Sequence, residues 1–176
     1  MEQLSLIKEK FPDPLDNSVR TFYRDSVRGI IFNDTRTELL MIYSQRYGDF
    51  GFPGGGIETN ETHGIALVRE IQEETGYTIN QIMNHALTTE EFRKSIFEDY
   101  DFFHMKSDFY FCSVDPAPEE YQPTQEEFEL KIQPKWVSIK DAHSHNSKLM
   151  MTGILDKCPW IERETRVLEF LMKNHI

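Results

Sequence analysis

The sequence has few of the features that mark secreted and membrane proteins. Its 176 residues include two cysteines, Cys112 and Cys158, which is too few for a disulfide framework. No positively charged start precedes an apolar run, and no apolar stretch approaches the roughly 18 residues that a membrane-spanning helix needs. We therefore expect a cytoplasmic protein without a membrane partner, in which both cysteines are buried apolar residues and not reactive thiols.

Positive charge is also scarce. Lysine and arginine number 19 against 30 aspartates and glutamates, which gives a formal net charge of −11. This balance argues against binding of long nucleic acid through a basic surface. A polyphosphate would need cations and local arginine or lysine to approach such a chain. The six histidines have no metal-ligand spacing, and His143-Ser144-His145 is expected to form a turn, so zinc is not implied.

The length suits one domain with a sizeable core and is too short for two ordinary ones. We divide the chain into an extension, residues 1–18, and a single domain, residues 19–176. The extension is polar with two prolines, and we expect either a short helix followed by a loop or a mobile tail. No internal repeat or low-complexity tract is present.

Hydrophobic patterns predict both strands and helices along the domain. Residues 22–32 and 38–43 are expected to pair as a β-hairpin around the turn Asn33-Asp34. Further strands are predicted at 79–97, 102–114 and 130–139, with an amphipathic helix at 161–174. Strands mixed with helices in this way indicate an α/β protein.

The most informative stretch is residues 55–77, GGIETNETHGIALVREIQEETGY. On a helix, Glu70, Glu73 and Glu74 fall within an arc of roughly 100°. We expect the opposite face, with Ile65, Val68, Ile71 and Thr75, to point to the core. Three carboxylates on one helix face beside a glycine-rich turn make a plausible cradle for divalent cations that carry a phosphorylated substrate.

The ends of this helix are also predicted. Asn60 is expected to be the N-cap and Gly76 the C′ residue in the left-handed conformation. Arg69 lies four residues before Glu73 and is expected to contact it. Phe52 and Pro53 suggest a short strand that leads into the glycines.

An E-x-x-E-E run alone is usually a solvated acidic face. The joint pattern is more specific: it has the form G-x5-E-x7-R-E-U-x-E-E-x-G-U, where U is a bulky apolar residue. Its fixed positions are occupied by Gly55, Glu61, Arg69, Glu70, Glu73, Glu74 and Gly76, and Ile71 is the first U. This stretch resembles the Nudix box, and the chain is similar to Nudix hydrolases. Tyr77 stands where an aliphatic residue is usual, which we expect to affect packing.

The resemblance implies a Nudix fold, an α/β/α sandwich with a central mixed β-sheet. It also implies hydrolysis of a nucleoside diphosphate linked to another moiety, with Mg²⁺ or Mn²⁺ as cofactor. By resemblance, Glu70, Glu73 and Glu74 bind the metal, the Gly55 carbonyl joins them, and Arg69 and Glu61 orient the helix. Family members are often dimers, so a homodimer is one expected state.

The base that takes a proton from the attacking water is left open. Glu70, Glu73 and Glu74 are candidates, as is a glutamate of a loop outside the box. Here that loop is residues 122–130, in which we favour Glu127 beside Glu126 and Glu129. Glu90 and Glu91 are weaker options.

Basic residues near the box are candidates for phosphate contacts: Arg28, Arg46, Arg93, Lys94 and Lys106. Of these, Arg28 and Arg46 are our substrate-binding candidates, with Tyr47 and Phe50 for stacking on a base.

Two other functions compete with this interpretation. One is removal of a 5′ pyrophosphate from RNA, which the acidic composition disfavours. The other is a non-catalytic Nudix domain that senses a nucleotide. Such a domain can lose box glutamates, whereas this chain keeps all of them.

Overall fold

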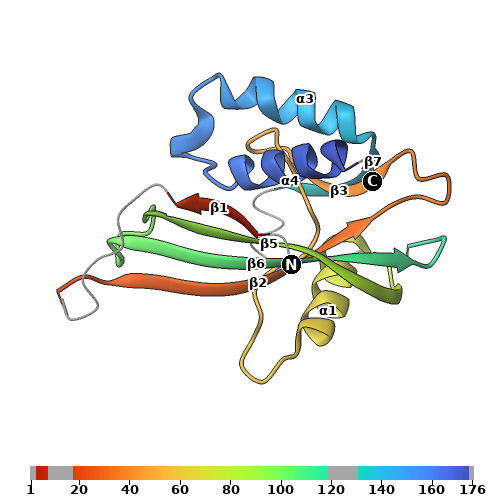
Figure 1. The fold of residues 1–176 in the computed structure, drawn as a ribbon, viewed down its shortest axis with the longest axis horizontal. Coiled ribbons are helices and arrows are strands. Elements are labelled where there is room, and N and C mark those ends of the chain that lie inside the picture. Colours follow the sequence, from red (N-terminus) through yellow and green to blue (C-terminus); the bar gives the residue numbers. More distant parts are fainter. Residues whose placement is uncertain (1–2, 8–17, 119–130, 175–176) are drawn as a thin grey trace.

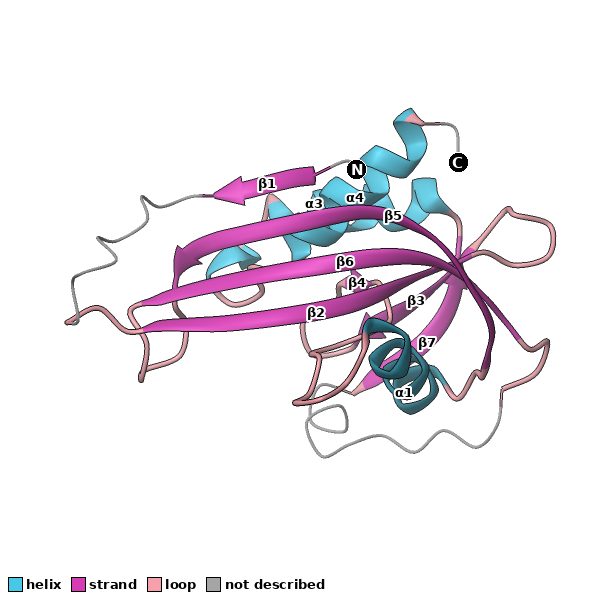
Figure 2. Ribbon diagram, turned by 60° about the horizontal axis from the view of Figure 1, so that its bottom comes forward, coloured by secondary structure: helices cyan, strands magenta, loops and turns pink. Residues whose placement is uncertain are grey.

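The β layer is covered by helices on both faces, as the computed structural model shows for residues 3–7, 18–118 and 131–174. Helices α3 and α4 lie on one side and α1 on the other (Figures 1 and 2). This confirms the expected α/β/α arrangement. The elements are β1 (Gln3–Ile7), β2 (Thr21–Ile31), β3 (Leu39–Ser44), β4 (Phe50–Gly51), α1 (His63–Thr75), β5 (Ile79–Lys94), β6 (Phe102–Val114), β7 (Ile132–Val137), α3 (Ile139–Met150), η1 (Ile154–Asp156) and α4 (Ile161–Lys173).

The strands form two sheets. The larger sheet is mixed and has the order β1-β5-β6-β2, in which β5 and β6 are antiparallel while β1 and β2 run parallel to their neighbours. The smaller sheet is antiparallel, with the order β4-β3-β7. The predicted strands of the β5–β6 pair and β7 are thus present. Strand β5 ends at Lys94, three residues before the expected end, so residues 95–101 join it to β6.

Successive side chains of a strand point to opposite faces of its sheet, so the strands contribute to a hydrophobic core on each face. Ile30 of β2 and Met41 of β3 belong to one buried cluster, together with Leu168 of α4. Ile31 and Leu40, their neighbours in the chain, belong to a second cluster with residues of α1. The two cores fix the helices to opposite faces of the sheets.

Helix α1 is rotated about its axis from the expected orientation. Its buried residues are Ala66, Leu67, Ile71 and Thr75, whereas Ile65 and Val68 are 55% and 39% exposed. On a helix, Glu70 and Glu74 fall between Ala66 and Ile71, inside the buried arc. The predicted core face was therefore confirmed for Ile71 and Thr75 and wrong for Ile65 and Val68. As a result, the side chains of Glu70 and Glu74 point to the glycine loop and not to solvent.

The ends of α1 were predicted in part. Thr62, not Asn60, is the N-cap, and its hydroxyl accepts a hydrogen bond from the Ile65 N–H at 3.3 Å. Asn60 instead has φ of +72°, in the turn that precedes the cap. Gly76 is the predicted left-handed C′ residue, with φ of +72°. Tyr77 packs against the α1 core and its hydroxyl accepts from Trp136 Nε1 at 3.1 Å.

Three other local predictions were wrong. Strands β2 and β3 share one bridge, Phe32 to Leu39, and then diverge into separate sheets, so they form no hairpin ladder. Residues 3–7 form an edge strand that pairs with β5, where a helix or tail was expected. His143 and His145 lie within α3, where we expected a turn.

Two expectations about composition can be compared with the structure. Cys112 and Cys158 are both free and buried, and burial raises the pKa of the Cys112 thiol to about 12. Neither is therefore a nucleophile near neutral pH. In the described part of the chain, no helix has both the length and the apolar composition to cross a bilayer.

Candidate active site

The loop between β4 and the turn before α1 runs along the edge of β2. Backbone bonds join it there: the N–H groups of Val27 and Gly29 donate to Gly55 O at 3.0 Å and Pro53 O at 2.8 Å. Gly54 has φ of +133°, and a Cβ at this position would lie 2.2 Å from the Val27 carbonyl oxygen. Only glycine permits this close approach.

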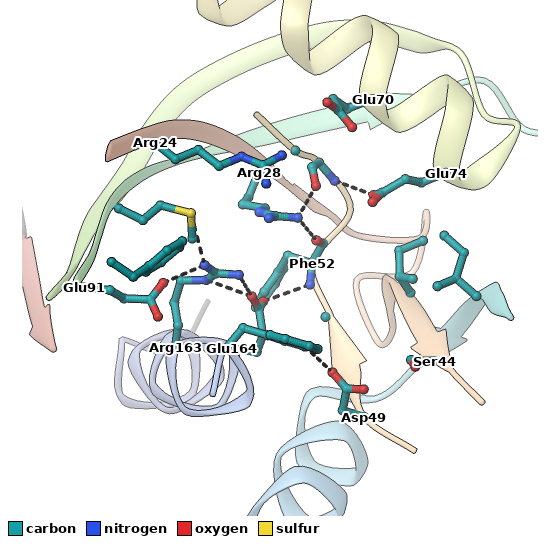
Figure 3. A pocket seen from close by; sticks show the side chains of 18 of the residues that line it. Arg24, Arg28, Ser44, Asp49, Phe52, Glu70, Glu74, Glu91, Arg163 and Glu164 are labelled. Atoms are coloured by element: carbon teal, nitrogen blue, oxygen red, sulfur yellow. Dashed lines mark hydrogen bonds and ion pairs between the residues drawn. The ribbon is translucent and has the colours of Figure 1, made fainter. Parts of the chain in front are cut away.

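Three charged side chains from three elements clamp this loop (Figure 3). Glu74 of α1 accepts a hydrogen bond from the Gly54 N–H at 2.6 Å, and Glu164 of α4 accepts one from the Phe52 N–H at 3.0 Å. Arg28 of β2 donates to the carbonyl oxygens of Phe52 and Gly54. The loop is thus positioned by side chains far apart in the sequence.

Arg69 links the acidic residues of the box. Its guanidinium makes a bidentate pair with Glu61 at 2.8 Å for both bonds, and Nη2 also donates to Gly56 O at 3.1 Å. Nη1 is shared by Glu70 at 2.8 Å and Glu73 at 3.2 Å, which includes the predicted contact with Glu73. The hydrogen bond from Arg69 is the main reason that the pKa of Glu61 falls to about 2.

Glu70 lies directly against the loop. A Cβ on Gly55 would be 2.3 Å from Glu70 Oε2, so the absent side chain leaves room for this carboxylate. Burial raises the pKa of Glu70, while the Arg69 guanidinium opposes that shift. A partly desolvated carboxylate beside a second acidic side chain favours a nearby cation.

A pocket of about 510 Å³ opens at this point. Its lining includes the box residues Gly54, Gly55, Glu70, Glu73 and Glu74. Figure 3 shows Arg24 and Arg28 beside the loop, between these glutamates and a buried ionic group formed by residues of α4 and β5. In that group Arg163 bonds to Glu91 at 2.7 Å and to its neighbour Glu164.

The structure brings together only some of the residues chosen from the sequence. Lys94 and Lys106 lie outside the pocket lining, whereas Arg28, Arg69 and Arg93 line the pocket with the three box glutamates. Arg46, Tyr47 and Phe50 do not: Arg46 lies over the Tyr47 ring, and Tyr47 packs on Trp160.

Several candidates for the base are engaged elsewhere or lie outside the described residues. Glu90 accepts from His104 at 2.8 Å, if that ring nitrogen is protonated, and Glu91 pairs with Arg163. Glu126, Glu127 and Glu129 lie outside the described residues.

Sequence reasoning missed other residues of the pocket, among them Arg24, Asp49, Glu58, Trp160, Arg163 and Glu164. Asp49 is 3% exposed and accepts from Trp160 Nε1 at 2.9 Å, and burial is the main cause of its raised pKa. Glu58 follows Gly56 by two residues, so its closeness to the glycines in the sequence was the available signal. The α4 residues carried no such signal, because only the fold brings them to the loop.

The donor set suits a hard divalent cation, which prefers carboxylate and carbonyl oxygens. In the described residues, however, no three acidic, histidine or cysteine side chains are arranged as a metal site. The three carboxylates are bonded to other groups of the protein: Glu70 and Glu73 accept hydrogen bonds from Arg69, and Glu74 accepts one from the Gly54 N–H. The Gly55 carbonyl accepts from Val27 N, which leaves its second lone pair.

Comparison with known proteins places this site in a family. A family model described as NUDIX domain matches residues 22–155, which is more than half of the chain. No curated protein matches significantly.

Solved structures give weaker likenesses. A MutT structure from work on Aliivibrio salmonicida and Vibrio cholerae is 27% identical over 68% of this chain and 83% of that chain, with a TM-score of 0.45. A NUDIX hydrolase from Nitrosomonas europaea is 18% identical, with coverages of 77% and 88% and a TM-score of 0.46. A UDP-X diphosphatase is 14% identical, with coverages of 72% and 56% and a TM-score of 0.49.

The matched segment contains the whole box, the glycine loop and the helix that presents its glutamates. Members of this family generally use divalent metals. With the box complete and its residues gathered at one pocket, the chain belongs to the Nudix family and is a hydrolase of the pyrophosphatase type that acts on nucleotide derivatives.

Proposed function

We propose that this enzyme cleaves a nucleoside diphosphate linked to another moiety, in a reaction that depends on Mg²⁺ or Mn²⁺. The observation that supports this is the contact between α1 and the glycine loop. Glu70 fills the space that a side chain at residue 55 would take, and Glu74 bonds to the loop backbone. Acidic side chains without a role would point to solvent, whereas these are pressed into a pocket.

Glu70, Glu73 and Glu74 would hold the metal, with the Gly55 carbonyl as a fourth oxygen. They fit such a role because they are oxygen donors on one helix face beside a loop cleared of side chains. When bound, the metal neutralises phosphate oxygens and lowers the pKa of a bound water. The bonds from Arg69 and Gly54 show that these carboxylates now accept from donors where a cation would bind.

The protein's own residues position the reacting groups. Arg69 ties the acidic face of α1 to Glu61 and to the Gly56 carbonyl, which fixes the helix against the loop. Arg28 holds the other side of the loop and lies at the pocket wall, where its charge favours a phosphate. The base that removes the water proton is one of Glu70, Glu73, Glu74 or Glu127.

Arg46, Tyr47 and Phe50 lie outside the pocket lining and would contact only a part of the substrate that extends beyond it. Residues 19–176 would form the catalytic domain and residues 1–18 an extension. Residues 3–7 of this extension add strand β1 to the larger sheet, parallel to β5.

The test is a panel of nucleotide sugars, dinucleotides, nucleoside triphosphates and oxidised deoxynucleoside triphosphates, assayed with Mg²⁺ and with Mn²⁺. We expect at least one to release a mononucleotide or pyrophosphate. Glu73→Gln and Glu74→Gln should each lower kcat by more than the roughly 10–100-fold typical of an outer-shell group. Circular dichroism should show an intact fold, because glutamine has the size and shape of glutamate and neither side chain is fully buried.

The matched control is Glu98→Gln, which removes the same charge from the exposed turn between β5 and β6. Its activity should equal that of the unsubstituted enzyme. Full activity in Glu74→Gln would show that the metal ligands are wrongly assigned, and no release from any compound would reject the reaction.

A further inference from the structure

One wall of the pocket is built by the larger sheet and carries arginines. In the β5–β6 ladder Arg93 pairs with Phe103, and Glu91 pairs with Met105. In the β2–β6 ladder Arg24 also pairs with Met105. These residues line the pocket together with Arg28, which shares a face of β2 with Arg24 because four residues separate them.

Arg93 has no bonded carboxylate among the described residues. Its guanidinium carbon lies 4.2 Å from the centre of the Phe103 ring, and Nη1 donates to the Lys94 carbonyl at 3.2 Å. Its Nε is buried without a hydrogen-bond partner in the described structure. The nearby Glu91 is already bonded to Arg163 at 2.7 Å. Arg93 thus keeps a charge and donor capacity that the described residues leave unmatched.

Arg24 and Arg28 are in a similar position. Arg24 is exposed and has no hydrogen bond or ion pair with any residue that the structure describes. Arg28 donates only to the two loop carbonyls, and its Nε also lacks a partner within the described ranges. The other two arginines of the pocket, Arg69 and Arg163, are bonded to carboxylates. In a chain of net charge −11, three arginines without such bonds on one wall point to an anionic ligand.

The same end of the pocket offers apolar surface. Ile96 and Phe97 line it and are 48% and 47% exposed. Phe97 is supported from behind by Phe22 and Phe103, with ring centres 5.6 Å and 6.3 Å away. An aromatic surface beside guanidinium groups suits a moiety that combines a phosphate with an apolar or planar part.

We propose that Arg24, Arg28 and Arg93 form a second phosphate subsite, for a phosphate of the substrate that the metal does not hold. The preferred substrate is then one in which the moiety beyond the scissile pyrophosphate carries its own phosphate, as in a dinucleoside polyphosphate. A neutral sugar in that place leaves the subsite empty. The inference rests on the proposed function, because the two sites share one pocket.

Phosphate binding measured without metal tests this subsite independently of catalysis. We would titrate inorganic tripolyphosphate into the full chain in EDTA by isothermal calorimetry. Arg93→Gln and Arg24→Gln should each weaken binding roughly tenfold, as expected for the loss of a charged contact. Lys94→Gln, one residue along β5 and outside the pocket lining, should bind as the unsubstituted chain does. Arg24 is exposed, so its variant folds even if that of Arg93 does not.

Activity then tests the substrate class. With diadenosine tetraphosphate, Arg93→Gln should raise KM about tenfold, while with ADP-glucose it should change KM little. Arg93→Lys, which keeps the charge, should restore part of the loss. Equal losses with both substrates would overturn the subsite, as would an absence of tripolyphosphate binding or an effect of Lys94→Gln equal to that of Arg93→Gln. Loss of the hydrolase assignment would instead show as inactivity on every compound while the EDTA titration still distinguished the variants.

Discussion

A single guanidinium organises the acidic face of the site. Arg69 contacts Glu61, Glu70, Glu73 and the Gly56 carbonyl, so one side chain sets the relation between the box helix and its loop. Glu61 provides the bidentate anchor that leaves Nη1 to the other two carboxylates. The arginine and first glutamate of the box therefore act as a positioning pair.

This pair should make stability depend on pH. Folding lowers the pKa of Glu61 from 4.5 to about 2, so its contribution is present above pH 4.5 and is lost as pH falls toward 2. We expect the difference in free energy of unfolding between the unsubstituted chain and Glu61→Gln to be constant near neutral pH. It should shrink as the pH falls through this window. Urea titrations at a series of pH values measure it, and a pH-independent difference would exclude the ion pair as its source.

At the scale of residues, the sequence predicted which side chains lie together where spacing within one segment determines it. The box glutamates, Arg69 and Gly76 lie within one helical segment, and helix geometry fixes their relation. Arg28 was predicted as a substrate contact, but its hydrogen bonds to the loop carbonyls of Phe52 and Gly54 were not predicted. Glu164 had no local pattern at all, because its partner Phe52 is 112 residues away.

At the scale of elements, α1 shows how a helix can be predicted with the wrong face inward. Its sequence offers two apolar arcs, and the sequence alone favoured the one that holds Ile65 and Val68. The structure buries Ala66 and Leu67 instead, which carries Glu70 and Glu74 to the loop. The bonds that decide between these arcs involve residues outside the helix, so helical periodicity could not select the face.

Helix α4 is joined to the site by a buried ionic group. Arg163 and Glu164 are 2% and 1% exposed, and Glu164 also bonds to the loop at Phe52. Desolvation would lower the pKa of Arg163, but the carboxylates of Glu164 and Glu91 outweigh it and raise that pKa. Removing one carboxylate leaves a buried cation with a single partner.

Glu164→Gln should therefore lower the free energy of unfolding by about 3 kcal/mol, the cost typical of breaking a buried ion pair. It should also lower activity, because the loop loses a charged anchor. Chemical denaturation and steady-state kinetics measure the two effects. The control is Glu169→Gln on the same helix, whose side chain is 39% exposed and lies 3.4 Å from His143 Nε2; we expect a change below about 1 kcal/mol. Equal effects of the two substitutions would contradict this role of α4.

At the scale of the whole molecule, the layer order was predictable and the division into two sheets was not. Apolar periodicity identified the long strands and the last helix, since each has a strong local pattern. Strands β2 and β3 flank a turn that normally makes a hairpin, yet the loop at residues 53–57 pairs with the edge of β2 next to the site. Which partner an edge receives depends on distant segments and is not encoded locally.

The net charge and the proposed metal site lead to a final prediction about the folded chain. A cation that binds only the folded state raises stability, by roughly 2.7 kcal/mol at 100 times its Kd. For a chain of this length, that corresponds to a rise in Tm of about 5–10 °C. However, any salt also screens the repulsion within a chain of charge −11. We therefore compare MgCl2 and MnCl2 with NaCl at matched ionic strength, and expect the divalent salts to raise Tm further. EDTA should reverse the excess, and Glu74→Gln should reduce it. An excess of the same size in Glu74→Gln would place the stabilising cation elsewhere on the molecule.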